Sequence, residues 1–518
     1  MPGADRVHPA APREFLVVRQ PTLTRLMTDG SDSRRSYLVV YRAARTLRKV
    51  LRNSLLSVAL AWLLAVCCAA GNVFSGLPPA QQSYEMFLVA KMMWFHGFFS
   101  ATTVAIYLSL LATEQLADRS TASSQLRHWL KKLTWRTSPI FVAVGLVIAG
   151  GCFAISSLLW EDRQYNVSTY YTHCCSYLFA VCVNVHARHL FRTETVRGQT
   201  QTFKQQEQLA RHPSRLQAPR TPSRQYLRVL CHDLPLIVSA LFATVYVHIV
   251  SFITIKTQWG LALFALCSIT MKLVIQELAK SFLFKQRRTP NMRTMAITVA
   301  APTILVDTQL RTVLLCQDST SMTLVSSMVL AVAEILMRTS KSAYVQWRTR
   351  RIMAQPPRQR LAVSLRSGET SSEIRRVRAA LQRSTSSIRL VDVTQDRAQR
   401  LLALHAAETY ADMYAEYIAM GCSYGILYFF SAHPKYKIGT GGVASSTGKS
   451  AVTYWSYMAT VALQVGIEVL VDFLACAIEI RHGIDFENFN QDDAFLAVFM
   501  VAVALINVHI SSSIYLRG

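Results

Sequence analysis

The chain has 518 residues, of which 51% are hydrophobic and only 16% are charged, whereas about 25% of an ordinary globular chain is charged. Its formal net charge is +25, and its mean hydropathy is positive, at +0.24. This combination excludes a disordered chain, a fibrous repeat and a disulfide-rich secreted scaffold. It predicts a membrane protein whose loops are basic.

Apolar windows long enough to cross a bilayer as helices, about 20 residues each, recur along the chain. They predict an all-α polytopic transmembrane bundle of about eleven spans, with ten as the alternative. The windows are Ser54–Phe74, Met86–Leu111, Ser138–Trp160, Tyr170–Phe191, Leu234–Ile255, Gly260–Phe284, Thr294–Cys316, Ser321–Arg338, Asp412–Phe430, Tyr454–Glu479 and Ala494–Tyr515.

The charge of the connections predicts the orientation of the spans, because Lys and Arg are retained on the cytoplasmic side. Residues 1–52 hold 11 basic and 4 acidic side chains, and residues 338–400 hold 15 and 4. Alternate connections, such as residues 75–85, are short and nearly free of Lys and Arg. The N-terminus and the basic loops are therefore predicted to be cytoplasmic, in the plasma membrane or an endomembrane.

The same charge pattern predicts four segments. A basic cytoplasmic segment (1–52) precedes an eight-span membrane block (53–338) and a basic, partly disordered cytoplasmic linker (339–400). An acidic membrane block of about three spans (401–518) follows, with 5 basic and 10 acidic side chains. Within the linker, a short helix is predicted at Glu373–Gln382.

No sequence motif for catalysis, a cofactor or a metal ion is present, so an enzyme is not favoured and no cofactor is predicted. Asn166-Val167-Ser168 is a sequon in a predicted external connection, which makes Asn166 a glycosylation candidate. The membrane on both sides of the basic linker argues against nucleic acid as a partner. The lipid bilayer is the predicted partner, with anionic head groups at the basic loops.

Ionisable side chains inside the predicted spans are the candidate functional residues, because a charge in hydrocarbon is costly unless it faces a partner in the bundle. Asp307 and Arg311 lie four residues apart on one helix, a spacing that lets them neutralise each other. The other candidates in the first membrane block are Lys272 and Glu334.

The densest acidic group lies in a predicted helical hairpin near the C-terminus. Asp412 and Glu416 are four apart on one helix, and Glu468 and Asp472 are four apart on the next. Counted from Phe430 and Tyr454 at about 1.5 Å per residue, Glu416 matches Glu468 at a depth of about 21 Å, and Asp412 matches Asp472 at about 27 Å. Four carboxylates are predicted to meet in the inner half of the membrane.

Three interpretations of this group remain open. The carboxylates share protons or hold a cation, they pair structurally with bases such as Lys272 or Arg311, or residues 401–416 form an interfacial helix whose acids are solvated. The first interpretation predicts a transporter or channel for a cation, a proton or a proton-coupled small solute. The alternative function is a receptor or scaffold whose basic loops bind lipids or proteins under control of phosphorylation.

Overall fold

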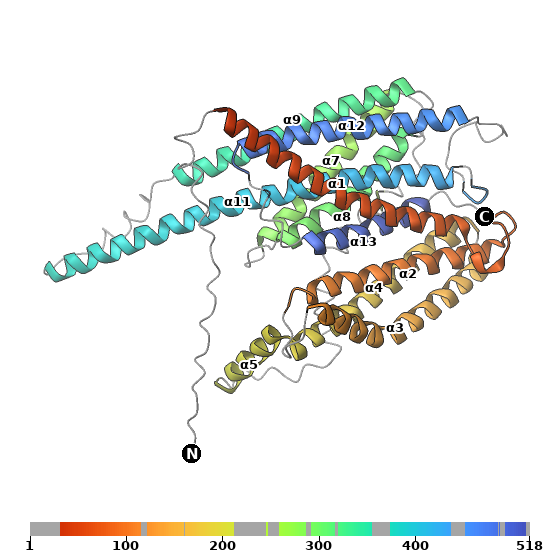
Figure 1. The fold of residues 1–518 in the computed structure, drawn as a ribbon, viewed down its shortest axis with the longest axis horizontal. Helices are drawn as coiled ribbons and strands as arrows, with labels where there is room; N and C mark the ends of the chain where they lie inside the picture. Colours follow the sequence, from red (N-terminus) through yellow and green to blue (C-terminus); the bar gives the residue numbers. More distant parts are fainter. Residues whose placement is uncertain are drawn as a thin grey trace, which may run out of the picture.

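The computed structural model describes residues 32–114, 122–159, 161–211, 245–246, 258–285, 292–315, 320–354, 373–431, 433–436, 451–484, 486 and 493–513. These residues form eleven α-helices and no strand, which confirms the predicted all-α class for this part of the chain. Most of the helices lie side by side along one direction, and α11 extends beyond the rest (Figure 1). The helices are α1 (Asp32–Ala70), α2 (Tyr84–Leu111), α3 (Ala122–Leu158), α4 (Glu161–Glu194), α5 (Val196–Arg211), α7 (Gln258–Lys285), α8 (Met292–Leu315), α9 (Thr320–Ala354), α11 (Glu373–Phe430), α12 (Ala451–Arg481) and α13 (Asp493–Ser513).

Ten of the eleven apolar windows coincide with these helices, and the window Leu234–Ile255 lies outside the described residues apart from positions 245 and 246. Four helical segments among the described residues are long and apolar enough to cross a membrane. They are Ser36–Ala70, Tyr84–Leu111, Gln125–Leu158 and Phe495–Ser512.

Helices α3 and α4 run in opposite directions. At one end of α3 and α4, Lys132 Nζ donates to Glu194 Oε1 at 2.8 Å, and at their other end Gln164 Nε2 donates to Ser156 O, also at 2.8 Å. α7 and α8 are likewise antiparallel, since residues 272 and 276 of α7 contact residues 307 and 303 of α8. The chain therefore contains at least two antiparallel helical hairpins.

Glu194 fixes the junction of α3, α4 and α5 on the surface of the bundle. Partial burial raises the pKa of its carboxyl, but hydrogen bonds from Lys132 and His128 outweigh burial and hold the pKa below its ordinary value. This carboxylate stays ionised at neutral pH and ties the start of α3 to the end of α4.

At the opposite end, a tight turn joins α1 to α2. Gly71 adopts φ +64°, and a Cβ there would lie 2.4 Å from the Phe87 ring, so only glycine fits. The buried side chain of Gln82 donates to the carbonyls of Ala70, Asn72 and Leu77 and closes the turn. The chain after α11 packs on this turn, because Lys435 Nζ donates to Gln82 O at 2.9 Å.

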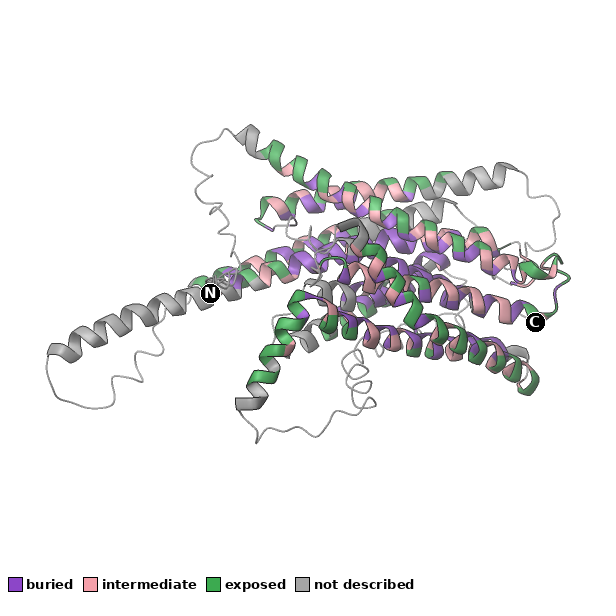
Figure 2. Cartoon of the chain, turned by 60° about the horizontal axis from the view of Figure 1, so that its bottom comes forward, coloured by how far each residue is buried: buried purple, intermediate pink, exposed green. Residues whose placement is uncertain are grey.

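The predicted membrane blocks 53–338 and 401–518 share one hydrophobic core. α11 packs against α8 and α1, and α13 packs against α1, α2 and α8. Buried side chains from both blocks, including Leu64, Phe95, Ile304, Tyr414 and Leu505, belong to one cluster. Buried residues concentrate along the centre of the bundle, with exposed ones toward its periphery and ends (Figure 2).

The bundle exposes many large apolar side chains in addition to those in its core, and it buries several charged ones. Large apolar side chains point outward: Leu55 is 70% exposed, Leu146 is 70% exposed and Leu263 is 68% exposed. Charged side chains such as Lys272 and Arg311 are buried. An extended apolar surface of this kind is typical of a surface that faces lipid or a protein partner.

The predicted linker 339–400 is helical at both of its ends. α9 continues to Ala354, and the helix predicted at Glu373–Gln382 begins at Glu373 as expected but runs unbroken to Phe430. Residues 355–372, between the two helices, lie outside the described part of the chain.

Candidate functional site

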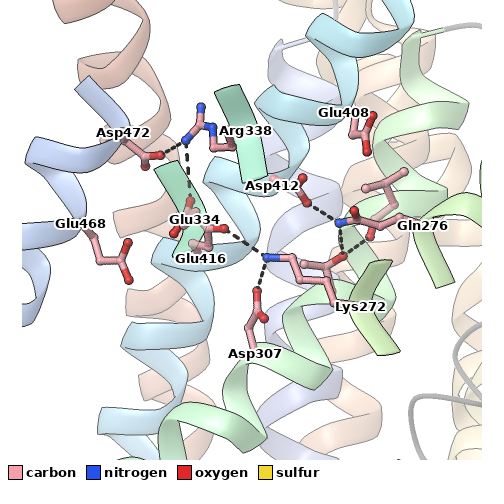
Figure 3. Close-up of polar contacts among 12 residues, drawn as sticks. Lys272, Gln276, Asp307, Glu334, Arg338, Glu408, Asp412, Glu416, Glu468 and Asp472 are labelled. Carbon is pink, nitrogen blue, oxygen red and sulfur yellow. Dashed lines mark hydrogen bonds and ion pairs between the residues drawn. The ribbon is translucent and has the colours of Figure 1, made fainter. Parts of the chain in front are cut away.

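Lys272 of α7 joins two other helices through its ammonium group. Its Nζ donates to Asp307 Oδ2 of α8 at 2.9 Å and to Glu416 Oε1 of α11 at 3.1 Å (Figure 3). All three side chains are buried. One positive charge therefore serves two buried carboxylates.

Arg338 of α9 is the centre of a second group. Its guanidinium forms an ion pair with Asp472 of α12 and lies 3.5 Å from Glu479 Oε2, about two turns further along that helix. It also lies 3.7 Å from Glu334 Oε1 on its own helix. Asp472 and Glu479 are 0% and 1% exposed. Here one positive charge faces three carboxylates.

Three further contacts extend the network toward both ends of the bundle. Arg311 of α8 donates to Glu468 of α12 at 2.6 Å, and Lys341 of α9 donates to Glu408 of α11 at 3.2 Å. Asp412 accepts a hydrogen bond from the neutral side chain of Gln276 at 2.7 Å. The network thus links α7, α8, α9, α11 and α12.

The network carries more acid than base. Among the described residues it contains eight carboxyl groups, four Lys or Arg side chains, and His405, whose Nδ1 lies 3.9 Å from Glu408 Oε2. The excess of four negative charges cannot stay ionised and uncompensated in a buried site, because burying an unpaired charge costs several kcal/mol. Protons or cations must supply the missing positive charge. The acids are Asp307, Glu334, Glu408, Asp412, Glu416, Glu468, Asp472 and Glu479, and the bases are Lys272, Arg311, Arg338 and Lys341.

Three of these acids come together from three helices. Glu334, Glu416 and Asp472 each offer a carboxylate oxygen, and these atoms all lie within 4.8 Å of one another. Oxygen atoms at this spacing are suited to a hard cation. The chemistry that this site supports is therefore binding and release of protons or of a cation.

The sequence predicted Glu334, Glu416 and Asp472 as candidates but did not predict which acids lie next to one another. Glu416 groups with Asp472 rather than with Glu468, because α9 lies against both α11 and α12 and brings Glu334 and Arg338 between them. Counting depth from Phe430 and Tyr454 assumed a closely packed hairpin of two helices. α11 and α12 are antiparallel, but each packs mainly against other helices.

One sequence interpretation holds in part and another is wrong. Asp307 and Arg311 attract each other on α8, but Asp307 forms its ion pair with Lys272 and Arg311 forms its ion pair with Glu468. Segment 401–416 is not a solvated helix, since Glu408 and Glu416 are each 4% exposed. In both cases contacts between distant helices replace the local arrangement that the sequence suggested.

Arg338, Lys341, Gln276 and Glu479 were missed as members of the network. Arg338 sits at the end of the predicted eighth span, where a basic residue is explained by topology alone. The spacing of four residues between Glu334 and Arg338, visible in the sequence, was the available signal.

Lys91 of α2 is a separate buried cation. Its ammonium lies 4.6 Å from the centre of the Tyr165 ring and 4.8 Å from that of Tyr436, and it donates to Ser512 at 3.0 Å. Aromatic faces stabilise a desolvated ammonium. Lys91 is therefore held by rings and one hydroxyl.

The predicted glycosylation candidate lies in a helix rather than in a connection. Asn166 is half-buried in α4, which begins at Glu161, and the Ser168 hydroxyl of the same sequon is fully buried. Glycosylation of Asn166 stays a prediction from the sequence.

No model of a known family, no curated protein and no solved structure matches the chain.

Proposed function

We propose that the chain is a multi-pass membrane protein of about eleven spans with a cytoplasmic N-terminus. Support comes from the outward-facing leucines, the inward-facing charges and the antiparallel helical hairpins. The helix ends that adjoin the Lys- and Arg-rich connections also lie at one end of the bundle. The start of α1, the end of α4, the end of α9 and the start of α11 lie at the left in Figure 1.

We further propose that the protein moves protons, a cation or a proton-coupled solute through the buried network. The observation that carries this proposal is that, among the described residues of the network, carboxyl groups outnumber Lys and Arg side chains by four. A structural network gains most from equal numbers of acids and bases, because every unmatched buried charge is destabilising. Intramembrane acids in excess of bases are typical of proton relays and ion pathways.

The helical start of α11 favours a second candidate function. This part of α11 extends well beyond the bundle in Figure 1, and its sequence is rich in arginine from Arg375 to Arg400. A projecting basic helix suits an anionic lipid surface. In this candidate function the protein is a receptor or scaffold, and its buried network has a structural role.

Flux measurement in proteoliposomes tests the first candidate against the second. The purified chain is reconstituted with a pH-sensitive dye inside and is challenged with a panel of monovalent and divalent cations. We expect cation or proton flux from the wild-type protein, and we expect the variants Glu416→Gln and Asp472→Asn to abolish it, because each removes an exchangeable charge from the network.

Glu85→Gln is the matched control, since Glu85 is exposed at the start of α2 and contacts none of the network residues. It is expected to retain wild-type flux. Normal flux in both network variants would exclude the network from transport. Absence of flux for every ion in correctly inserted wild-type protein would favour the scaffold.

A further inference from the structure

The three carboxylates that converge inside the bundle leave oxygen atoms without donors. Glu334 Oε1, Glu416 Oε2 and Asp472 Oδ2 are buried without a donor in good hydrogen-bond geometry, although Glu334 and Glu416 lie next to each other and the Tyr417 hydroxyl lies near Asp472. Each side chain is more than nine-tenths buried. A buried acceptor left without a donor costs about 1–3 kcal/mol, and more when it is charged. Three such atoms in one place indicate a positively charged ligand.

The local charge indicates the valence of this ligand. Glu334 and Asp472 face the single positive charge of Arg338, and Glu416 shares Lys272 with Asp307. Arg338 also faces Glu479, so five carboxylates share the two positive charges of Arg338 and Lys272, which leaves an excess of three when all five are ionised. A divalent cation compensates two of these charges, whereas a monovalent cation compensates one.

The spacing of the oxygens indicates the size of the ion. Two ligands on opposite sides of one ion are separated by at most twice the bond length, which is about 4.6–5.2 Å for Ca²⁺ and about 4.0–4.2 Å for Mg²⁺. The ligand atoms of the trio lie within 4.8 Å of one another. This limit accommodates Ca²⁺ without movement of the helices. A buried site also favours an ion that gives up its water more readily than Mg²⁺ does.

We propose that Glu334, Glu416 and Asp472 bind one divalent cation such as Ca²⁺, for which Mn²⁺ serves as a spectroscopic probe. The inference depends on the proposed function for the role of the ion as a transported or coupling species, but the binding itself is independent of that role. The site joins α9, α11 and α12, so the ion bridges three helices (Figure 3).

Arg338 has a defined part in this binding. Its guanidinium pairs with Asp472 and lies 3.7 Å from Glu334, so it contacts two of the three ligands. A divalent ion at the trio and the guanidinium therefore compete for the same carboxylates. Binding of the ion must move Arg338 toward Glu479, its other acidic neighbour at 3.5 Å.

Binding of Mn²⁺ to the purified full-length protein in detergent tests the proposal. Free Mn²⁺ is followed by electron paramagnetic resonance, and the concentration of Ca²⁺ or Mg²⁺ needed to displace the bound ion is then measured. We expect one saturable Mn²⁺ site per chain, displaced by Ca²⁺ at lower concentration than by Mg²⁺. Glu416→Gln and Asp472→Asn should lose this site, and the control Glu85→Gln should keep it.

Size-exclusion profiles show whether each variant is folded. If a variant fails to fold, the displacement of Mn²⁺ by Ca²⁺ and Mg²⁺ from the wild-type protein still tests the site. Absence of saturable Mn²⁺ binding, or unchanged binding in folded Asp472→Asn, would overturn the proposal. Proton flux without Mn²⁺ binding would overturn the divalent site alone and leave the proposed transport intact. Mn²⁺ binding without flux would support the divalent site and overturn the proposed transport.

Discussion

Replacing Arg338 with methionine is expected to destabilise the protein by about 3–5 kcal/mol, the usual cost of removing one partner from a buried ion pair. The substitution keeps the volume of the side chain but leaves Asp472, Glu479 and Glu334 facing one another without a counter-charge. Asp472 and Glu479 are essentially inaccessible to solvent, so water cannot take over this role. The loss is measured as a lower midpoint of thermal unfolding in detergent.

Two matched variants test whether charge is the cause. Arg348→Met, at an exposed position on the same helix, should leave the midpoint unchanged. The double variant Arg338→Met/Asp472→Asn should recover part of the loss, because one of the stranded negative charges is removed and the two changes are coupled. If Arg338→Met and Arg348→Met had the same midpoint of thermal unfolding, the burial of the network would be contradicted.

The second large effect is expected at Gly421, where α11 meets α1. A Cβ at this position would lie 2.4 Å from Cγ2 of Val58, and Trp62 Nε1 donates to the Gly421 carbonyl at 2.8 Å. Gly421→Leu forces the two helices apart, and overpacking of this kind costs about 1–3 kcal/mol. The same change also disturbs the Trp62 hydrogen bond. Thermal unfolding in detergent and the yield of monodisperse protein measure the effect.

Gly466→Leu is the control for this substitution, because a Cβ at Gly466 on α12 meets nothing within 4 Å. Leucine there is expected to be neutral or slightly stabilising, since it has a higher helix propensity than glycine. If both substitutions lowered the midpoint equally, the close approach of α1 and α11 would not be the reason.

Sequence patterns were sufficient to predict the apolar helices, because a long run of apolar residues favours a buried or membrane-spanning helix wherever it occurs. The polar helix α5 was not predicted. The windows Gly260–Phe284 and Tyr454–Glu479 fall within α7 and α12 although both carry ionisable residues. Glu416 and Asp472 could be identified as candidates from the sequence because an acid inside an apolar helix is costly to bury.

The partners of these charges could not be predicted in the same way. Lys272 and Glu416 are 144 residues apart in the chain, and Arg338 and Asp472 are 134 apart. Only the packing of α9 against α11 and α12 decides which side chains meet, and no local spacing encodes it. Local rules gave Asp307 and Arg311 as a pair, whereas longer-range contacts give each a different partner.

The central claim is that the helices cross a bilayer and hold the acidic network within it. Accessibility of tags at Gly30, Thr370 and Gly518 in sealed, oriented vesicles tests this claim most directly. Our account predicts that the tags at Gly30 and Thr370 are reached only from the cytoplasmic side, and the tag at Gly518 only from the opposite side. Tags at Gly30 and Thr370 in opposite compartments, or release of the protein from membranes by alkaline extraction, would contradict it.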